Sequence, residues 1–284
     1  MKTIVLLTDF SEEAFRAAEF ACEIAACMQV KKIILYNAHS SVMAFGSSTD
    51  GAAVVTEENE LYRENMEALG LLQDRLRSMA GKDVVFEMVA DNMGIPGIAD
   101  WLEEKKEGGE SGLLVLGVSH KSGFDKWLEG SPTNEALKKN DWPVLIVPEN
   151  TPLGKSIDTV VFASDMKEVD NLPADVIHEV LNAFPAKLHL LHVQKESKNE
   201  PIAERQIAVV ALHELLDQYD PKFHYRTCND IVDEILSFAN EQKASIIITV
   251  HRKHGFWERM FSESVRRKLA EKTSIPLLSL PGLS

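Results

Sequence analysis

The sequence predicts an α/β fold made of two tandem copies of a five-stranded parallel sheet with helices on both faces. Short apolar runs such as Leu113–Leu116 are typical of strands buried on both faces of a parallel sheet. Segments with apolar residues at three-and-four spacing separate these runs, which indicates strand–helix–strand crossovers. The same order of signals then occurs a second time along the chain, which indicates an internal repeat.

The first copy begins with a strand at Lys2–Leu7, followed by the tripeptide Thr8-Asp9-Phe10. Ser11 suits the N-cap of the next helix, because its hydroxyl can accept from a free N–H group of the first turn. The remaining elements are predicted in this order: strand Lys31–Ala38, loop Ser40–Val55, helix Thr56–Met79, strand Asp83–Ala90, helix Ile95–Lys106, strand Leu113–Leu116, a helix opening at Ser131-Pro132, and strand Val144–Val147.

The second copy repeats these markers in the same order. LLTDFSEEA is matched by FASDMKEVD, which aligns Asp9 with Asp165, and KKIILYNAH is matched by AKLHLLHVQ. We therefore predict a first domain at residues 1–149, a linker at 150–155 and a second domain at 156–284. The apolar fifth strands, Val144–Val147 and Leu277–Leu280, are expected to pair with each other, since an unpaired apolar edge favours aggregation.

Composition excludes several classes of partner. The formal net charge of -14 argues against nucleic acid and against an anionic membrane surface, both of which need a basic footprint. The first residues lack the long apolar region of a signal peptide, and no later run approaches the length of a membrane span. Cys22, Cys27 and Cys228 form neither a metal-binding spacing nor an even disulfide set, which favours a reducing cytoplasm.

A glycine-containing loop joins the strand at Leu113–Leu116 to the next helix. It begins at Gly117 and ends at Gly130-Ser131, directly before Pro132. Free backbone N–H groups and the helix dipole make such a loop a candidate anion cradle. The alternative is a plain connector whose glycines only let the chain turn.

These features resemble the universal stress protein family, whose ATP-binding members carry a glycine motif ending in Gly-Ser or Gly-Thr after the fourth strand. Gly117, Gly130 and Ser131 match the motif, whereas His120 stands where its middle glycine would be. The resemblance covers nearly the whole chain as two copies. It implies two Rossmann-like domains of the adenine nucleotide alpha hydrolase type, and ATP or another adenine nucleotide as ligand, with Mg²⁺ accompanying it.

The resemblance also implies roles for residues of the first copy. Asp9 and the backbone near Asn37 and Ala38 would hold the adenosine, and the glycine loop would hold the phosphates. The candidate nucleotide-binding residues are Thr8, Asp9, Phe10, Asn37, Ala38, Gly117, Ser119, His120, Lys121, Gly130 and Ser131. Structural roles stay open for several: Asp9 as a helix cap, Asn37 as a strand-end polar residue, and His120 as a loop histidine that blocks the cradle rather than binding in it.

The second copy departs further from the motif. Thr249 and Arg252 replace its first two glycines, and Glu263 would bring negative charge towards a phosphate. The basic cluster His251–His254 can accept a different anion or form a solvated turn. We therefore expect no ATP in this half.

Two functions of different class remain open. One is a stress-response regulatory protein that binds an adenine nucleotide in its first domain. The other is a non-nucleotide interaction or dimerisation module with both sites degenerate. The phosphate-loop, dinucleotide and nucleophile-elbow motifs are missing from the sequence, so we expect no catalytic or metal-binding residues and regard slow ATP hydrolysis as the one activity to test. The expected assembly is an intrachain pseudo-dimer, with a homodimer as a further possibility.

Overall fold

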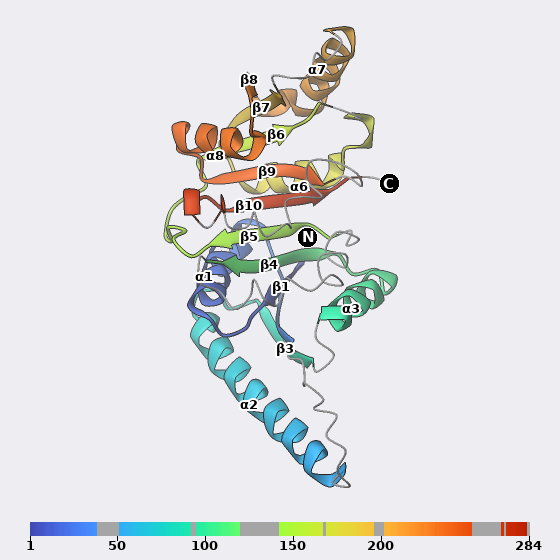
Figure 1. Cartoon of the computed structure of the whole chain (residues 1–284), viewed down its shortest axis with the longest axis vertical. Helices are drawn as coiled ribbons and strands as arrows, with labels where there is room; N and C mark the ends of the chain where they lie inside the picture. Colours follow the sequence, from blue (N-terminus) through green and yellow to red (C-terminus); the bar gives the residue numbers. More distant parts are fainter. Residues whose placement is uncertain are drawn as a thin grey trace. The chain divides into compact units, whose positions relative to one another are not determined.

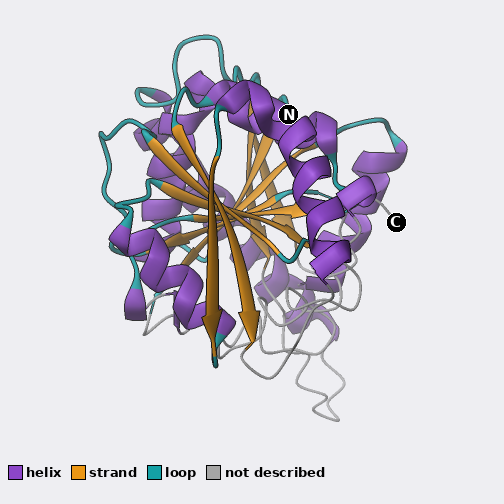
Figure 2. Cartoon of the chain, turned by 90° about the horizontal axis from the view of Figure 1, so that it is seen from above, coloured by secondary structure: helices purple, strands orange, loops and turns teal. Residues whose placement is uncertain are grey.

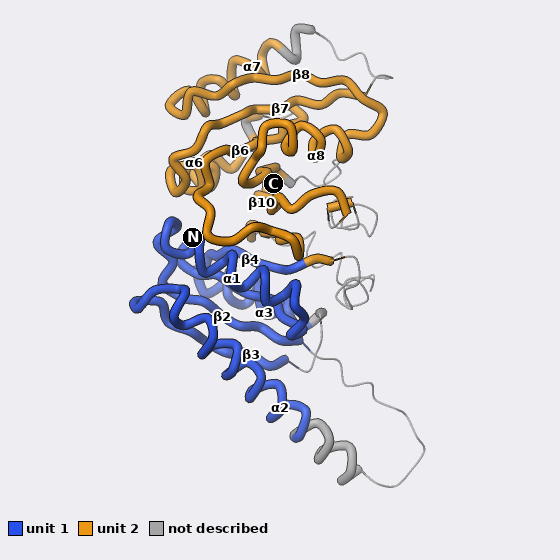
Figure 3. The backbone as a smooth tube through the Cα atoms, turned by 90° about the vertical axis from the view of Figure 1, so that its left-hand side faces the viewer, with its two compact units in different colours: residues 1–117, 122–140 blue, residues 118–121, 141–284 orange. Residues whose placement is uncertain are grey.

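A computed structural model defines the fold of the chain (Figure 1). It describes residues 1–38, 51–91, 95–119, 142–166, 169–195, 202–251, 268–269 and 271–282. The described residues divide into two compact units (Figure 3). Those up to Gly117 belong to unit 1, and those from Val118 onward belong to unit 2. None of the described helices is both long enough and apolar enough to cross a membrane.

Unit 1 is a parallel sheet with the strand order β3-β2-β1-β4. Its elements are β1 (Thr3–Leu7), α1 (Glu12–Cys27), β2 (Lys32–Ala38), α2 (Gly51–Arg77), β3 (Val85–Asp91), α3 (Ile95–Glu107) and β4 (Gly112–Val118). Every residue of β1 and β4 is buried, whereas the edge strand β3 is half-exposed. This gradient is why the central strands are continuously apolar in sequence.

Unit 2 repeats this alternation of strands and helices. Its elements are β5 (Val144–Pro148), β6 (Thr159–Ser164), η1 (Val169–Asn171), α6 (Ala174–Ala183), β7 (Lys187–Lys195), α7 (Ile202–Leu216), η2 (Asp217–Tyr219), β8 (Lys222–Cys228), α8 (Ile231–Glu241), β9 (Ile246–His251) and β10 (Leu277–Pro281). The strands β10-β9-β6-β7-β8 form a five-stranded parallel sheet in that order. Strands lie inside and helices outside in Figure 2, which confirms the predicted α/β class.

The fifth strands of the two copies pair with each other. Strand β5 runs antiparallel to β10, with Ile146 opposite Leu277 and Val144 opposite Ser279. All five residues of β5 are buried. The sequence-based prediction that these apolar strands pair is therefore confirmed, and the physical reason is removal of an apolar edge from water.

The start of α2 differs from the sequence-based expectation. Helix α2 begins at Gly51, so the prediction of a loop as far as Val55 was wrong. Residues 51–55 contain two alanines and no proline, and alanine is the best helix former, so the helix pattern extends further back than its charged part suggests. The predicted helix at Ser131-Pro132 lies outside the described residues.

Tyr36 forms a buried polar contact at the end of β2. Its side chain is fully buried, and its hydroxyl donates to Oδ2 of Asp91 at the end of β3. The ring of Trp101 on α3 lies 5.3 Å from the Tyr36 ring, centroid to centroid. Burial and the neighbouring Asp91 carboxylate raise the pKa of Tyr36, so the phenol stays protonated and keeps donating. The contact ties the ends of β2 and β3 together.

Replacing Tyr36 by phenylalanine is expected to lower the free energy of unfolding by about 2 kcal/mol, because Asp91 loses a hydrogen-bond donor in a part-buried place. Tyr62→Phe is the matched control, since Tyr62 is 49% exposed and its change should stay within about 0.5 kcal/mol. Urea denaturation followed by circular dichroism measures both. Equal losses in the two variants would contradict the assigned role.

Candidate functional site

In each copy the strand order of the sheet reverses between two central strands. In unit 1 the reversal lies between β1 and β4, and in unit 2 it lies between β6 and β9. Open α/β sheets bind ligands beyond the carboxyl ends of the strands at this point. The sequence-predicted residues Thr8, Asp9, Phe10, Asn37, Ala38 and Gly117 stand at the carboxyl ends of β1, β2 and β4. Ser119 is buried, and His120, Lys121, Gly130 and Ser131 lie outside the described residues.

A tight turn follows β1. The backbone N–H of Thr8 donates to the carbonyl of Tyr36 at 3.0 Å, which extends the β1–β2 ladder by one residue. The N–H of Phe10 then donates to the Thr8 hydroxyl at 3.0 Å. Phe10 has a φ of 63°, a left-handed conformation that is uncommon for an aromatic residue. The turn leaves the Phe10 ring 39% exposed at the sheet edge.

Asp9 supports the start of α1. Its Oδ1 accepts from the Ser11 N–H at 3.1 Å and from the Ser11 hydroxyl at 2.5 Å. The Ser11 hydroxyl oxygen accepts in turn from the N–H of Ala14 at 3.3 Å, which confirms Ser11 as the N-cap. Asp9 is therefore not itself the cap but holds the cap in place, with both bonds on Oδ1.

Asn37 is the polar residue that the structure buries at this edge. Its side chain is 5% exposed, and Nδ2 donates to the carbonyl of Thr8 at 2.8 Å. The other amide atom, Oδ1, is buried without a hydrogen-bond partner among the described residues. A buried acceptor without a donor is unfavourable by about 1–3 kcal/mol. This acceptor lies at the carboxyl end of β2, the edge at which open α/β sheets bind ligands.

Gly117 has a structural reason to be glycine. A Cβ atom at this position would lie 2.2 Å from the carbonyl oxygen of Glu13 and 2.8 Å from the backbone nitrogen of Ala14. These are backbone atoms of the first turn of α1 and cannot move away independently. Close packing of α1 against the end of β4 thus requires glycine here, independently of the phosphate contact that the sequence motif implies.

The turn after β6 reproduces the turn after β1. The N–H of Met166 donates to the Ser164 hydroxyl at 3.1 Å, and Met166 has a φ of 55°. His192 Nδ1 lies 3.1 Å from the Ser164 carbonyl, which is the counterpart of the 2.8 Å contact between Asn37 Nδ2 and the Thr8 carbonyl. The alignment of Asp9 with Asp165 therefore corresponds to equivalent backbone geometry, and His192 is the structural counterpart of Asn37.

The copies differ in where the next helix begins. Helix α1 starts at Glu12, three residues after Asp9, whereas α6 starts at Ala174, nine residues after Asp165. The intervening chain in unit 2 forms the short helix η1. Thr249, which aligns with Gly117 in sequence, is fully buried. The strand register instead matches Gly117 with Val250, because Leu6 pairs with Val115 and its counterpart Phe162 pairs with Ile248.

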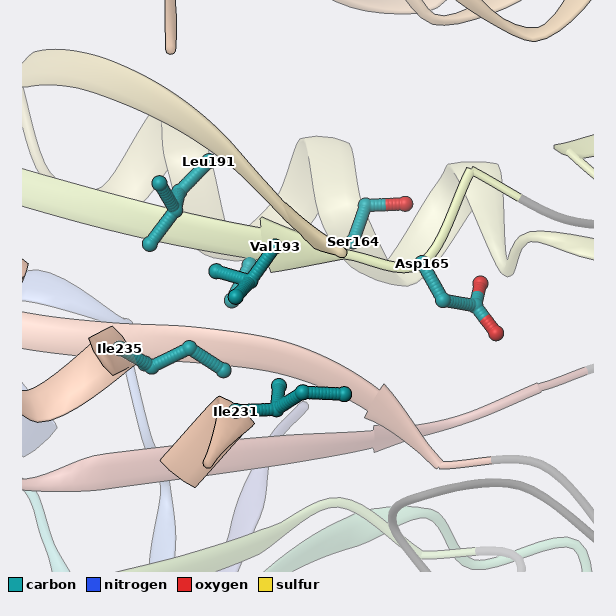
Figure 4. Close-up of a pocket in the computed structure, with 7 residues that line it drawn as sticks. Ser164, Asp165, Leu191, Val193, Ile231 and Ile235 are labelled. Carbon is teal, nitrogen blue, oxygen red and sulfur yellow. The ribbon is translucent and has the colours of Figure 1, made fainter. Parts of the chain in front are cut away.

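Unit 2 also contains a hollow at this edge, which sequence reasoning missed. It is small, with a cavity volume of about 30 Å³, and is lined by Ala163, Ser164, Asp165, Leu191, Val193, Ile231 and Ile235. In Figure 4 the α8 isoleucines face the β7 side chains, and Asp165 stands at one end. The sequence does contain a signal for it: Ile231 and Ile235 are one helical turn apart and therefore share a helix face. They directly follow Asp230, which caps α8.

The comparisons with known proteins agree with this architecture. The model of the universal stress protein family matches residues 1–148, which is more than half of the chain. The chain belongs to the universal stress protein family. A universal stress protein of Methanocaldococcus jannaschii is 30% identical over 151 residues, covering 51% of this chain and 81% of that protein.

Two solved structures show the fold over almost the whole chain. The structure of a universal stress protein from Archaeoglobus fulgidus has a TM-score of 0.70 at 18% identity, covering 99% of this chain and 97% of its own. A Pseudomonas aeruginosa protein described as belonging to the same family has a TM-score of 0.58 at 15% identity, covering 99% and 94%. At these identities the likeness concerns the fold alone.

Proposed function

We propose that this universal stress protein is a regulatory binding protein whose first copy binds ATP or another adenine nucleotide, with Mg²⁺ accompanying the phosphates. The ligand would occupy the carboxyl edge of β1 and β2, beside Asp9, Phe10 and Asn37. The described residues of this edge do not pair a nucleophile with a base, so the proposal is binding and response rather than catalysis. The second copy, in which Thr249 aligns in sequence with the glycine, serves a structural and modulating role.

Oδ1 of Asn37, which has no hydrogen-bond partner among the described residues, carries this proposal. The hydrogen bond from Nδ2 to Thr8 fixes the orientation of this amide, so its Oδ1 is held as an acceptor for an exocyclic amino group that enters this edge. Phe10 is exposed two residues after Thr8, to which Asn37 is hydrogen-bonded, and its ring offers a face for stacking on a planar base. Asp9 adds a carboxylate that can accept from ribose hydroxyl groups. An adenine nucleoside presents these donors and this planar surface.

Replacing Asn37 by alanine is expected to weaken ATP binding about tenfold, which corresponds to about 1.4 kcal/mol for one lost hydrogen bond. His192→Ala is the matched control, because it removes the equivalent contact to the Ser164 carbonyl in the other copy. Its affinity for ATP should equal that of the parent. Isothermal titration calorimetry with Mg²⁺-ATP measures both variants. Equal weakening in the two variants would contradict the assignment of the binding site to the first copy.

One observation favours a second function, a non-nucleotide interaction module. The packing of α1 explains why position 117 is glycine. This residue of the glycine motif is therefore no longer evidence for a phosphate site. In that case the chain would act through its surfaces, for instance as a homodimer. Mass spectrometry of small molecules released from the denatured protein separates the functions. Release of an adenine nucleotide supports the nucleotide-binding function. If no nucleotide is released and calorimetry detects no ATP binding, the interaction module is supported instead.

A further inference from the structure

Two histidines on neighbouring strands of unit 2 share one hydrogen bond. His189 on β7 and His224 on β8 stack with ring centroids 5.1 Å apart, and Nδ1 of the first lies 3.0 Å from Nε2 of the second. His189 is only 7% exposed. One of these two nitrogens must carry a hydrogen and the other must not, so the pair is stable with at most one proton more than its neutral form. A second added proton would place two N–H groups against each other.

Helix α8 packs on this pair. The Phe238 ring lies 4.8 Å from the His224 ring and 6.2 Å from the His189 ring, centroid to centroid. Phe238 lies on the same face of α8 as Ile231 and Ile235, at helical spacings of three and four residues. One helix face therefore covers the histidines at one end and the hollow at the other.

Strand β7 also connects the histidine pair to the hollow. His189, Leu191 and Val193 alternate along the strand and so point to one face of the sheet. The last two line the hollow beneath α8. The histidine pair and the hollow thus belong to one contact between α8 and the sheet, and any movement of α8 away from the histidines also moves a wall of the hollow.

The charges around the pair disfavour further protonation. Lys187 on β7 and Lys222 and Arg226 on β8 face it with positive charge. Glu241 on α8 is the carboxylate that faces it, and Arg226 already binds that group at 3.1 Å. Burial is the largest cause that lowers the pKa of both histidines. For His189 the charge of His224 comes next, followed by the lysines, and for His224 Arg226 comes next. A group whose folded-state pKa is lowered stabilises the fold less as pH falls through its unfolded value of about 6.5.

We propose that the His189–His224 pair is a proton-operated latch, which at acid pH releases α8 from the face of β7 and β8 and thereby opens the hollow beneath Ile231 and Ile235. Opening frees both imidazoles to take up protons. Each proton taken up on opening raises the opening equilibrium up to about tenfold per pH unit below 6.5. The neutral, closed state holds above that pH. The latch is a property of unit 2 and is independent of the proposed nucleotide site in the first copy.

Hydrogen–deuterium exchange of the full chain at pH 7.5 and 5.5, corrected for the intrinsic pH dependence of exchange, tests the latch. In the parent, α8 amides should exchange at least about tenfold faster at pH 5.5, whereas α1 in unit 1 should keep its protection. His189→Gln/His224→Gln should abolish the acid response of α8. His213→Gln is the matched control, since this histidine lies on α7 with an exposed side chain, and it should retain the response.

Two results would overturn the proposal. One is α8 protection in the parent that is the same at both pH values. The other is an acid response that persists unchanged in the double variant. If the double variant leaves α8 unprotected at pH 7.5, the single variant His224→Gln decides. A response smaller than that of the parent supports the latch, and an equal response excludes it.

Discussion

Replacing Phe238 by alanine is expected to lower the free energy of unfolding of unit 2 by about 3–5 kcal/mol, the range for a buried Phe→Ala change. Phe238 is 1% exposed and contacts both histidine rings. The guanidinium of Arg226 lies 5.5 Å from its ring centroid and adds a cation–π contact. The cavity left behind would lie between α8 and the sheet, which cannot close without moving the helix. Guanidinium denaturation followed by circular dichroism measures the loss.

Phe10→Ala provides the control for this large effect. Phe10 follows β1 in unit 1 and is 39% exposed. Its truncation therefore leaves no cavity and should change stability by no more than about 0.5 kcal/mol. A loss below about 1 kcal/mol in Phe238→Ala would mean that α8 is not anchored through this ring. The role of α8 as the connection between the histidines and the hollow would then fail as well.

A methyl group at Gly117 is expected to destabilise unit 1 by about 3 kcal/mol, at the upper end of the usual range for overpacking. The new Cβ would lie 2.2 Å from the Glu13 carbonyl oxygen, so either β4 or the first turn of α1 must shift. Such a shift would also disturb the Ser11 cap and the turn at Asp9. Thermal unfolding should show a drop of several degrees.

Gly70→Ala is the matched glycine control, with an effect of opposite sign. Gly70 lies within α2, and a Cβ there would have nothing within 4 Å. Alanine in a helix is more favourable than glycine by about 1 kcal/mol, so this variant should be more stable than the parent. Two Gly→Ala changes with opposite signs would show that packing against α1, and not glycine content, governs the first. A Gly117→Ala protein as stable as the parent would contradict the close packing.

The sequence by itself determined the class of fold, the repeat and the pairing of the fifth strands. These follow from local patterns: unbroken apolar runs report burial on both faces of a strand, and three-and-four spacing reports a helix against a sheet. The correspondence of Asp9 with Asp165 was visible for the same reason, because each directly follows the end of a buried strand. Where local signals conflict, the sequence misled, as at the start of α2, where small residues resemble a loop but continue a helix.

Only the tertiary structure decided what individual residues of the candidate site do. The need for glycine at position 117 depends on how closely Glu13 approaches from another element, which no local pattern records. The pairing of His189 with His224, 35 residues apart, depends on the register between β7 and β8. That Oδ1 of Asn37 is buried without a partner in the described part of the chain likewise depends on what surrounds the end of β2. Burial and contact are properties of neighbours that are distant in sequence, so they appear only when the chain is folded.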